Sequence, residues 1–543
     1  MAGRAHGLER RSVVSSFIFH FPTTLSDQPL IALFKRSGKV STYKHHIAPI
    51  SGTISRSDAD PLAAAWRELS EETGINPSSA TFWRVGKPFS FVDESVNREW
   101  TVHPFAFQLK GTAVGSRRDS AIELDWEHDG WEWYNPADVL NGNGLKGKKE
   151  LPHLRESLRR VWLEGELNAR AGKALRRGLE KLQNDHENGS HELASIALGA
   201  FRDVVENMQD GMGDAKWWED VQMVAWHLVK NGRESMGAAA LNALLAILEE
   251  MEEIWRLESG RIDSGAEWKL ERMLTIIDHH LKGRKSRAGL VKDMFASYVR
   301  DHFLSEGQPR DKLTILTLSA SSTIRDSIVE AFASLDIAAL ELRVLESRPL
   351  FEGVSVSSSI LSKFKTQCKE PSKHLHITIY TDASAAIAAK DVDMVLVGAD
   401  RISISKGVSN KTGSLPVVLC AKHAAPNASI VVLSELEKVN GENGLIDDSK
   451  QEDNDPAELI RSWRNEGVKG LRAIEEGFHS AIRMEKSNHS VEVRNVYFEW
   501  IPLDMVDGFV SGEGALSHRN IREKARQQDE LARRYFESIS LRY

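Results

Sequence analysis

The sequence has little cysteine and no long apolar run. Cys368 and Cys420 are the two cysteines among 543 residues, which excludes a disulfide framework or a cysteine-rich zinc site and favours a reducing compartment. The longest apolar run, residues 239–248, ends at an acidic stretch and falls short of the ~18 residues that a membrane-spanning helix needs. The N-terminus lacks the apolar core and cleavage site of a signal peptide. We therefore expect a cytoplasmic protein with no membrane segment.

The chain also lacks a strong excess of either charge. Lys and Arg number 70 and Asp and Glu number 78, so the formal net charge is −8. Such a balance gives no general attraction to phosphate backbones or anionic lipid, and direct DNA binding is not expected. A hydrophobic content of 41% and a charged content of 27% are ordinary for globular proteins. Because 543 residues exceed one ordinary domain, we expect two or three folded units.

The pattern of apolar residues divides the chain into three parts. Residues 1–165 carry short β-rich runs and one obvious helix, whereas residues 166–306 carry long segments with a helical period of 3.6. In residues 307–543, compact apolar runs such as LTILTL and DMVLVGA alternate with helix-like stretches, which is typical of βαβ units. The predicted fold class is α/β, with a small N-terminal α/β domain, a helical subdomain and a C-terminal, Rossmann-like, doubly wound parallel sheet.

Two later segments have their own predictions. The polar, mostly acidic stretch at 439–470 can bury little apolar surface, and we interpret it as a solvated loop in preference to a partner-binding tail. The segment at 522–540 predicts an amphipathic helix that packs on the last domain.

A cluster of carboxylates stands in the single obvious helix of the N-terminal part. Glu68, Glu71 and Glu72 are spaced i, i+3 and i+4, which places them on one helix face. Like charges at these spacings repel, so the array is reasonable if a hard divalent cation with oxygen ligands neutralises it. A bare acidic face would be solvated surface, but bound Mg²⁺ would clamp a pyrophosphate and polarise a water, as cleavage of a phosphoanhydride requires.

The surroundings of these carboxylates resemble the Nudix hydrolase signature. That signature runs Gly, five residues, Glu, seven residues, then Arg-Glu-aliphatic-x-Glu-Glu-x-Gly-aliphatic. The resemblance covers about residues 10–165 and implies a Nudix α/β/α sandwich, Mg²⁺ or Mn²⁺ as cofactor, and a nucleoside diphosphate derivative as substrate. It also implies that the Arg and Glu residues of the helix hold the metal and orient the helix. Every fixed position of the second half matches, at Arg67, Glu68, Leu69, Glu71, Glu72, Gly74 and Ile75.

The first half of the signature is looser. Its glycine is Gly52, one residue earlier than the count from Arg67 requires, and its first Glu falls at Ala59, so that Asp58 or Asp60 is left for this role. Gly52 is predicted to lie at the substrate. Further candidates are Glu127 as an additional carboxylate and four aromatic residues that would stack on a base or lie in the core, which are Trp83, Phe89, Phe91 and Trp100.

Polar residues follow the predicted strands of the C-terminal part. In open α/β sheets, ligands bind at the carboxyl ends of the strands. Hydroxyls and backbone N–H groups at a helix start, an arginine and a lysine would together bind phosphate, and an aspartate can act as acid or base. The residues concerned are Ser319 and Ser321 after one strand, Arg348 after the next, Asp400 after a third, and then Asn410 and Lys411.

These fragments, in this order, resemble a known family. It contains the alpha, beta and delta subunits of translation initiation factor 2B, methylthioribose-1-phosphate isomerase and ribose-1,5-bisphosphate isomerase. The resemblance spans about residues 165–530 and includes NGRESM, with Arg233 and with Glu234 in place of the family's proline. The other matching runs are ESRPLFEG at 346–353, VDMVLVGADRI at 392–402, NKTGS at 410–414, NVYFEWIP at 495–502 and EGALS at 513–517.

The functional meaning of this resemblance divides. In the isomerase branches a cysteine and the aspartate of Gly-Ala-Asp-Arg carry the proton or hydride movement, and Asp400 matches that aspartate. The cysteine position falls at Ser319, and a serine is far less acidic than a thiol. The phosphate-binding complement is retained in Arg233, Arg348, Asn410 and Lys411. The initiation-factor subunits show that the fold also serves as a noncatalytic module.

Three hypotheses follow. The first is a Mg²⁺-dependent Nudix pyrophosphohydrolase, with Arg67, Glu71 and Glu72 catalytic, fused to a domain that binds a phosphorylated metabolite and mediates assembly. The second is an active sugar-phosphate isomerase that uses Asp400. The third is a noncatalytic regulator or scaffold of translation initiation that meets translation factors. The resemblance further implies a homodimer or larger assembly, and the pairing of domains suggests that the first half releases a ribose phosphate that the second half binds.

Overall fold

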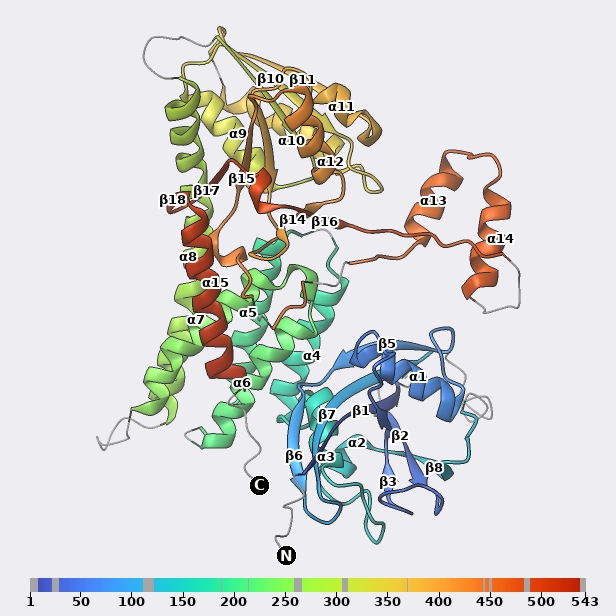
Figure 1. The fold of residues 1–543 in the computed structure, drawn as a ribbon. Helices are drawn as coiled ribbons and strands as arrows, with labels where there is room; N and C mark the ends of the chain where they lie inside the picture. Colours follow the sequence, from blue (N-terminus) through green and yellow to red (C-terminus); the bar gives the residue numbers. More distant parts are fainter. Residues whose placement is uncertain are drawn as a thin grey trace, which may run out of the picture. The chain divides into compact units, whose positions relative to one another are not determined.

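The computed structural model describes residues 8–21, 29–110, 122–186, 188–212, 214–257, 266–304, 311–368, 370–442, 445–448, 452–482 and 489–537. The chain divides into two compact units, with the boundary between Arg176 and Arg177. Figure 1 labels their elements. We call the part before this boundary the first unit and the part after it the second unit.

The first unit is built on a mixed eight-stranded sheet. Its central path runs β3-β2-β1-β7-β5, and β4, β6 and β8 pair with β1, β7 and β2. Strands β1 and β7 are parallel neighbours, whereas the other pairs are antiparallel. The strands are β1 (Glu9–His20), β2 (Leu30–Arg36), β3 (Ile47–Ala48), β4 (Ile50–Thr53), β5 (Ala80–Val85), β6 (Phe89–Asp93), β7 (Arg98–Leu109) and β8 (His128–Tyr134).

Helices cover both faces of this sheet. Alternate residues of β1 point to opposite faces, so Val14 and Ile18 pack beneath α1 (Pro61–Thr73), while Phe17 and Phe19 pack against the other side. The second face is closed by α2 (Pro136–Leu140) and α3 (Leu154–Val161). The arrangement is a helix–sheet–helix sandwich, as the sequence predicted.

The second unit begins with helices and continues into a sheet. Helix α4 (Ala169–Asn184) crosses the boundary between the units. Helix α8 (Ala266–Phe303) packs on α5 (Ser190–Asn207) and α7 (Ala238–Arg256) at one part and on α9 (Ser322–Ser334) and β17 (Gly508–Ser511) at another. The further helices of this part are α5 (Ser190–Asn207), α6 (Ala215–Lys230), α7 (Ala238–Arg256) and α8 (Ala266–Phe303), with a 3₁₀ turn at η3 (Glu234–Met236). The domain boundaries at 165 and 306 stay predictions.

The sheet of the second unit is doubly wound, as predicted. Its order is β11-β10-β9-β12-β15-β17-β18, and all neighbours are parallel except β17 and β18. The chain order reverses between β9 and β12, which is where ligands bind in such sheets. The strands are β9 (Lys312–Thr317), β10 (Ala339–Leu345), β11 (His374–Tyr380), β12 (Met394–Gly398), β15 (Ser429–Leu433), β17 (Gly508–Ser511) and β18 (Gly514–Leu516).

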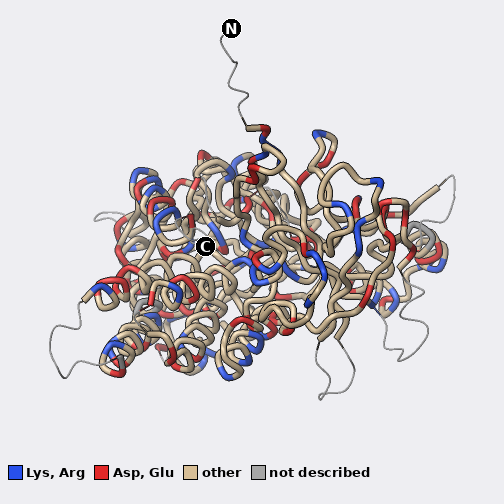
Figure 2. The backbone as a smooth tube through the Cα atoms, turned by 90° about the horizontal axis from the view of Figure 1, so that it is seen from below, with Lys and Arg blue, Asp and Glu red and all other residues tan. Residues whose placement is uncertain are grey.

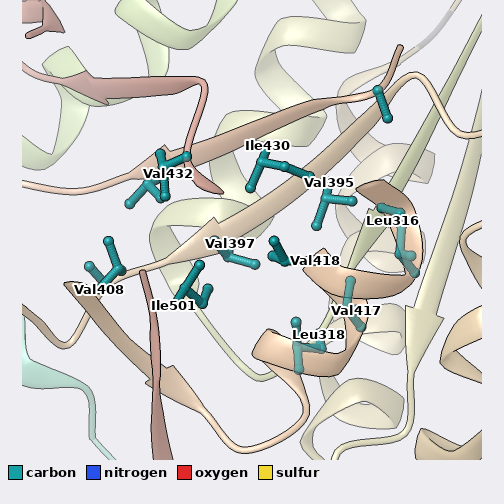
Figure 3. Packing of buried hydrophobic residues seen from close by; sticks show 14 of the residues in the cluster. Leu316, Leu318, Val395, Val397, Val408, Val417, Val418, Ile430, Val432 and Ile501 are labelled. Atoms are coloured by element: carbon teal, nitrogen blue, oxygen red, sulfur yellow. The ribbon is translucent and has the colours of Figure 1, made fainter. Parts of the chain in front are cut away.

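Buried aliphatic residues fill both faces of this sheet. On β12, Val395 and Val397 point to one face and Met394 and Leu396 to the other, so the strand reads as a continuous apolar run. Figure 3 shows the core on the face of Val395 and Val397, where Val417 of α12 packs on the strands. The first face is covered by α11 (Ala385–Ala388), α12 (Ser414–Ala424) and α15 (His518–Ala532), and the second by α8, α9 (Ser322–Ser334) and α10 (Glu352–Gln367).

The acidic stretch at 439–470 is only in part the solvated loop that we predicted: its residues 464–470 are exposed, but earlier residues are held by distant partners. Asn440 is fully buried, Glu452 pairs with Arg233, and Asp448 pairs with Arg401 at 3.2 Å between Nε and Oδ1. The stretch also contains α13 (Ala457–Asn465), and α14 (Leu471–Ile482) follows it. The composition of the stretch predicted solvation because it does not show the partners of these polar groups, which lie far away in the sequence.

The C-terminal helix is confirmed in α15. Ile521 and Ala525 lie in the sheet core, and Gln528 donates a hydrogen bond to the carbonyl of Val439 at 3.3 Å. Beyond α15, Arg534 pairs with Glu252 of α7, so this end of the chain also contacts the helical part of its unit. A small antiparallel sheet of β13 (Arg401–Ser403), β14 (Gly407–Lys411) and β16 (Phe498–Ile501) completes the unit.

Basic and acidic residues are interspersed along the backbone of the described chain (Figure 2). This agrees with the nearly balanced composition. No helix in the part of the chain that the structure describes is both long and apolar enough to cross a membrane.

Candidate functional site

Helix α1 places the carboxylates of the first unit. The Asp60 carboxylate accepts a hydrogen bond from a first-turn N–H at 2.8 Å, Pro61 opens the helix, and Gly74 ends it at a φ of 69°, which favours glycine. The helix buries Ala65 and Leu69 against the sheet. The register set by these contacts brings Glu68 against Gly52 of β4 and Glu72 against His128.

A cavity of about 420 Å³ opens beside this helix. Glu68 and Glu72 line it from α1, and Glu127 lines it from the turn before β8. Three arginines and three aromatic residues line it as well, and they are Arg11, Arg36, Arg98, Tyr43, Phe91 and Trp100. The cavity therefore joins an acidic end to basic and aromatic walls.

The carboxylates crowd one another. Burial, with the charges of Glu127 and Glu68, raises the pKa of Glu72 to about 9. Burial also raises the pKa of Glu127, with contributions from Glu68 and Glu71, although Arg36 opposes the shift. Excess negative charge in this corner is the condition that a bound cation would relieve.

His128 supports Glu72 from behind. Its Nε2 lies 2.6 Å from Oε2 of Glu72, and both side chains are buried. Burial and the charge of Arg36 lower the pKa of His128 to about 4, so the imidazole is neutral near pH 7. A neutral histidine can hold one oxygen of Glu72 without adding a charge to the site.

Arg67 ties the loop to the helix. Its Nε and Nη2 donate to the two carboxylate oxygens of Asp58 at 2.9 and 3.0 Å, and its Nη1 donates to Glu68 at 2.8 Å and to Glu71 at 3.1 Å. Of the two aspartates beside Ala59, Asp58 pairs with Arg67, whereas Asp60 caps the helix. Asp58 was one of the two alternatives that the sequence left open.

Gly52 leaves room for Glu68. A Cβ at this position would overlap the Glu68 carboxylate, so no larger residue fits without moving it. Gly52 stands on β4 opposite Val14 of β1 and lines the cavity. The inserted residue of the loop therefore leaves this close approach in place.

The donor set suits a hard divalent ion. No group of three or more His, Cys, Asp or Glu side chains within the described ranges is already arranged to hold a metal. The carboxylates of Glu68, Glu72 and Glu127 nevertheless share one cavity, and the charges of Glu68 and Glu127 help to raise the pKa of Glu72. Oxygen ligands are those that Mg²⁺ and Mn²⁺ prefer. Glu71 is the most exposed of the group at 59% of its side chain, and Arg67 holds it.

In the second unit, the switch point between β9 and β12 gathers polar side chains. Ser321 caps α9, with its Oγ accepting from a backbone N–H at 3.3 Å. Asn410 of β14 donates to the carbonyl of Gly398 at 2.8 Å, and both Asn410 and Ser321 lie beside that glycine. The structure thus brings together two of the predicted ligand-binding residues.

The predicted phosphate-binding cations are each paired with a carboxylate. Arg233 Nη2 lies 2.7 Å from Oε1 of Glu452, and Lys411 Nζ lies 3.0 Å from Oε2 of Glu352. Arg348 is 41% exposed, and its Nε donates to Glu346 at 2.9 Å. A phosphate group would have to displace these carboxylates or bind beside them.

Asp400 faces a mixed group of charges. Burial raises its pKa, while Lys438 and Arg233 oppose the shift and Glu352 and Glu452 add to it. Lys438 also donates to the carbonyl of Ala399 at 2.8 Å. A raised pKa brings a carboxyl group closer to the range in which an acid–base residue works.

Ser319 has no thiol beside it that could replace the expected cysteine. It adopts a φ of 68°, and its N–H donates to Oγ of Ser347 at 2.9 Å. Cys368 ends α10 and packs at the core beneath α8 and α9, and Cys420 packs on the opposite core. The protein therefore has the expected aspartate, Asp400, but no cysteine at or beside position 319.

Sequence reasoning missed several residues of both sites. Arg36 ends β2 and lines the cavity, and Glu352, Lys438 and Glu452 surround Asp400. Lys438 comes shortly after the parallel strand β15, so the strand-end rule could have found it, whereas Arg36 ends an antiparallel strand to which that rule does not apply. Glu452 carried no local signal.

Comparison with known families identifies both units. The sequence model of the Initiation factor 2 subunit family matches residues 188–518. The chain belongs to the Initiation factor 2 subunit family. The model of the NUDIX domain matches residues 18–154, so this family member carries a Nudix domain in front of its family region. Both predicted resemblances are confirmed, and the Nudix domain confirms the prediction of a hydrolase domain.

Curated relatives of the family region include methylthioribose-1-phosphate isomerases. That of Geobacillus kaustophilus is 24% identical over 264 residues, which cover 46% of this chain and 66% of the relative. That of Verticillium alfalfae is 29% identical over 153 residues, which cover 26% and 36%. The chain thus spans less than two thirds of the length of these relatives.

Solved structures with a similar arrangement include initiation factors. The Pyrococcus horikoshii translation initiation factor eIF-2B has a TM-score of 0.43 at 18% identity, covering 64% of this chain and 98% of that one. A chain of the tetrameric eIF2B-beta2-delta2 complex from C. thermophilum has a TM-score of 0.44 at 12% identity, covering 66% and 99%.

Proposed function

We propose that the first unit is a Mg²⁺-dependent pyrophosphohydrolase of a nucleoside diphosphate derivative, with Mn²⁺ as an alternative ion. The observation that carries this proposal is the meeting of Glu68, Glu72 and Glu127 in one cavity with a buried arginine, Arg36. Crowded carboxylates suit a divalent cation, and the arginine suits a phosphate. The Nudix domain match supports the same chemistry.

The residues in and beside the cavity would have different roles in hydrolysis. Glu68, Glu71 and Glu72 would hold the metal, which when bound polarises phosphoryl oxygens and lowers the pKa of a bound water. Arg67 fixes the orientation of Glu68 and Glu71 through its hydrogen bonds. Glu127, whose pKa is raised by burial, is suited to accept the proton of the attacking water.

Arg36 and Gly52 serve the substrate. Arg36 lines the cavity, and its buried Nε has no hydrogen-bond partner among the described residues, so the charge of its guanidinium is available to a phosphate bound in the cavity. Gly52 lets the Glu68 carboxylate approach β4 closely, which keeps the acidic end of the cavity compact.

The full-length chain is expected to release nucleotide from a member of a panel of NADH, ADP-ribose, nucleoside diphosphate sugars and dinucleoside polyphosphates, only when Mg²⁺ is present. At limiting Mg²⁺ the rate should rise with pH up to about 9, because Glu72 must lose its proton to bind the ion. Below that pH, Mg²⁺ affinity should fall by up to about tenfold per pH unit. If none of these substrates released nucleotide, or if EDTA left the release unchanged, the proposal would be contradicted.

For the second unit, we propose a binding and assembly role. The charge of Arg233 acts on Asp400, and Asp400 donates its N–H to Ser409 of β14, the strand that also carries Asn410 and Lys411. Arg233, Asn410 and Lys411 would bind a phosphorylated metabolite, for which a ribose phosphate released from an ADP-ribose-like substrate is the candidate. Exposed apolar side chains on neighbouring elements, Leu361 of α10, Ile379 of β11 and Ile387 of α11, suit a homodimer or larger assembly. A role with translation factors is the noncatalytic alternative, and a pull-down without any turnover would favour it.

An active isomerase is the second candidate, because Asp400 has a raised pKa beside Lys438 and Arg233. With serine at position 319, we expect no conversion of methylthioribose 1-phosphate or ribose 1,5-bisphosphate by the full-length chain. If product did form, and if Asp400→Asn abolished its formation, the chain would instead be an active isomerase.

A further inference from the structure

A long connection of the second unit carries glutamates to its predicted phosphate-binding residues. The connection runs from β15 to β16 and contains α13 and α14. An antiparallel bridge between Asp453 and Val496 pairs the segment before α13 with the segment after α14, and Figure 1 shows the two segments side by side. In the same pairing, Tyr497 donates its N–H to the carbonyl of Glu452 at 3.2 Å. We call residues 452–466 the strap.

The first glutamate of the strap, Glu452, is bound as an anionic ligand would be. Its Oε1 accepts from Nη2 of Arg233 at 2.7 Å and from Nδ2 of Asn454 at 2.9 Å. Its Oε2 accepts from the hydroxyl of Ser235 and lies 3.4 Å from Nε of Arg233. A guanidinium that offers two N–H groups, together with a hydroxyl and an amide, would suit a phosphate group equally well. Glu452 therefore stands where we expect the phosphate of a ligand.

The last glutamate of the strap, Glu466, meets a second predicted phosphate-binding residue. Its Oε1 lies 3.1 Å from Nη2 of Arg348, the arginine that follows β10. The two side chains are 44% and 41% exposed, so solvent screens this pair and it opens readily. The strap thus contacts Arg233 through a buried ion pair and Arg348 through an exposed one, although α13 separates the two glutamates in the chain.

The middle of the strap is tied to the small sheet that carries a third predicted cation. Glu458 of α13 accepts from Nδ2 of Asn495 at 2.9 Å and from the hydroxyl of Tyr497. The ring centre of Tyr497 lies 4.2 Å from Nζ of Lys411 on β14. The backbone of the strap is therefore anchored beside Lys411, while the contacts of Glu452 and Glu466 are made by side chains that can exchange for another anion.

We propose that the strap is autoinhibitory: in the ligand-free chain Glu452 and Glu466 occupy Arg233 and Arg348, and a phosphorylated metabolite binds by displacing both carboxylates. This inference rests on the proposed binding role of the second unit and adds a threshold to it. Because ligand binds only where the carboxylates have moved away, the apparent Kd equals the intrinsic Kd divided by the fraction of chains in that state.

Glu466→Gln is expected to lower the Kd of the full-length chain for ribose 5-phosphate by up to about fivefold, because the ligand no longer has to break an exposed ion pair. In an Arg348→Gln background the same substitution should change nothing, since the pair is already absent. Glu476→Gln is the matched control. It removes an equal charge from α14, where Glu476 pairs with Arg472 at 2.8 Å, and it should bind like the wild type. Isothermal titration would measure all of these Kd values.

Hydrogen exchange adds a readout that a purely structural ion pair would not change. Saturating ribose 5-phosphate should speed the exchange of backbone amides in α13 of the wild type, because the strap loses its two outer side-chain contacts when the ligand binds. Inorganic phosphate at saturation should have the same effect. Slower or unchanged exchange in α13 upon binding would contradict the proposal.

The titrations separate the strap from the binding role on which it rests. A lower Kd in Glu466→Gln that depends on Arg348, with wild-type binding in Glu476→Gln, would support the strap. Equal Kd values in all three proteins would overturn the strap and leave the binding role in place. If neither the wild type nor Glu466→Gln bound ribose 5-phosphate or inorganic phosphate, the binding role and the strap would both be wrong.

Discussion

Glu72→Gln is expected to lower kcat for Mg²⁺-dependent hydrolysis by about 100-fold or more, because an amide cannot give up a proton to become a charged ligand. The substitution should leave the fold intact. Glu72 is protonated near pH 7 in the metal-free protein, since its pKa is raised to about 9, and glutamine has the same shape and no charge. The hydrogen bond with His128 can be kept by the amide. Steady-state kinetics with a Mg²⁺ titration would measure the loss.

Stability against pH gives this variant a second readout. A carboxyl group whose pKa is higher in the fold than in the unfolded chain stabilises the fold fully at low pH. That contribution disappears as pH rises from about 4.5 toward 9. In metal-free protein, the wild type should therefore lose stability across this window relative to Glu72→Gln, and Mg²⁺ should restore it to the wild type alone.

Glu94→Gln serves as the control for both measurements, because Glu94 is exposed in the turn between β6 and β7 and does not line the cavity. Full activity in Glu72→Gln would show that Glu72 is not needed for metal binding. If the stabilities of the wild type and Glu72→Gln depended on pH in the same way, the neighbouring carboxylates would not raise the pKa of Glu72 in solution.

The acidic helix could be predicted from sequence because its geometry is local. Glu68, Glu71 and Glu72 share a face through helix periodicity alone, and Arg67 reaches two of them within the same helix. The parallel sheet was predictable for a similar reason, since strands buried on both faces, such as β12, read as continuous apolar runs.

The remainder of each site depends on pairing between distant segments. Glu127 reaches the cavity because β8 pairs with β2, and Phe91 does so because it stands opposite Trp100 in the register of β6 and β7. The register of paired strands cannot be read from composition. The sequence therefore could not tell which of the four aromatic candidates line the cavity and which lie in the core. The structure divides them: Phe91 and Trp100 line the cavity, whereas Trp83 packs beside Phe19.

The acidic stretch at 439–470 is the clearest case in which composition misled. Glu452 lies 219 residues from Arg233 in the sequence, and few apolar residues surround it. A segment of this composition is expected to stay solvated, because it cannot offset its ordering by apolar burial. Ion pairs and hydrogen bonds with a buried arginine and with Ser235 hold it instead.

Glu452→Gln is expected to destabilise the second unit by about 3–5 kcal/mol and to make it responsive to phosphate. Burial opposes ionisation of Glu452, yet hydrogen bonds from Arg233 and Ser235 lower its pKa, so the carboxylate is charged in the fold. Removing that charge leaves a buried guanidinium without its counterion. A phosphate group can then take its place, and binding to the folded state alone raises the melting temperature.

Thermal unfolding of the full-length chain in increasing ribose 5-phosphate or inorganic phosphate would test this, with a larger rise in Tm expected for Glu452→Gln than for the wild type. Glu252→Gln is the matched control. Glu252 is also buried in the second unit and pairs with Arg256 and Arg534. Its loss should cost less, because the side chains of Arg256 and Arg534 are 62% and 46% exposed and water can solvate their charges, and phosphate should not rescue this variant specifically. Equal phosphate responses in the two variants would mean that Arg233 is a structural cation and that the anion-binding residues of this unit lie elsewhere.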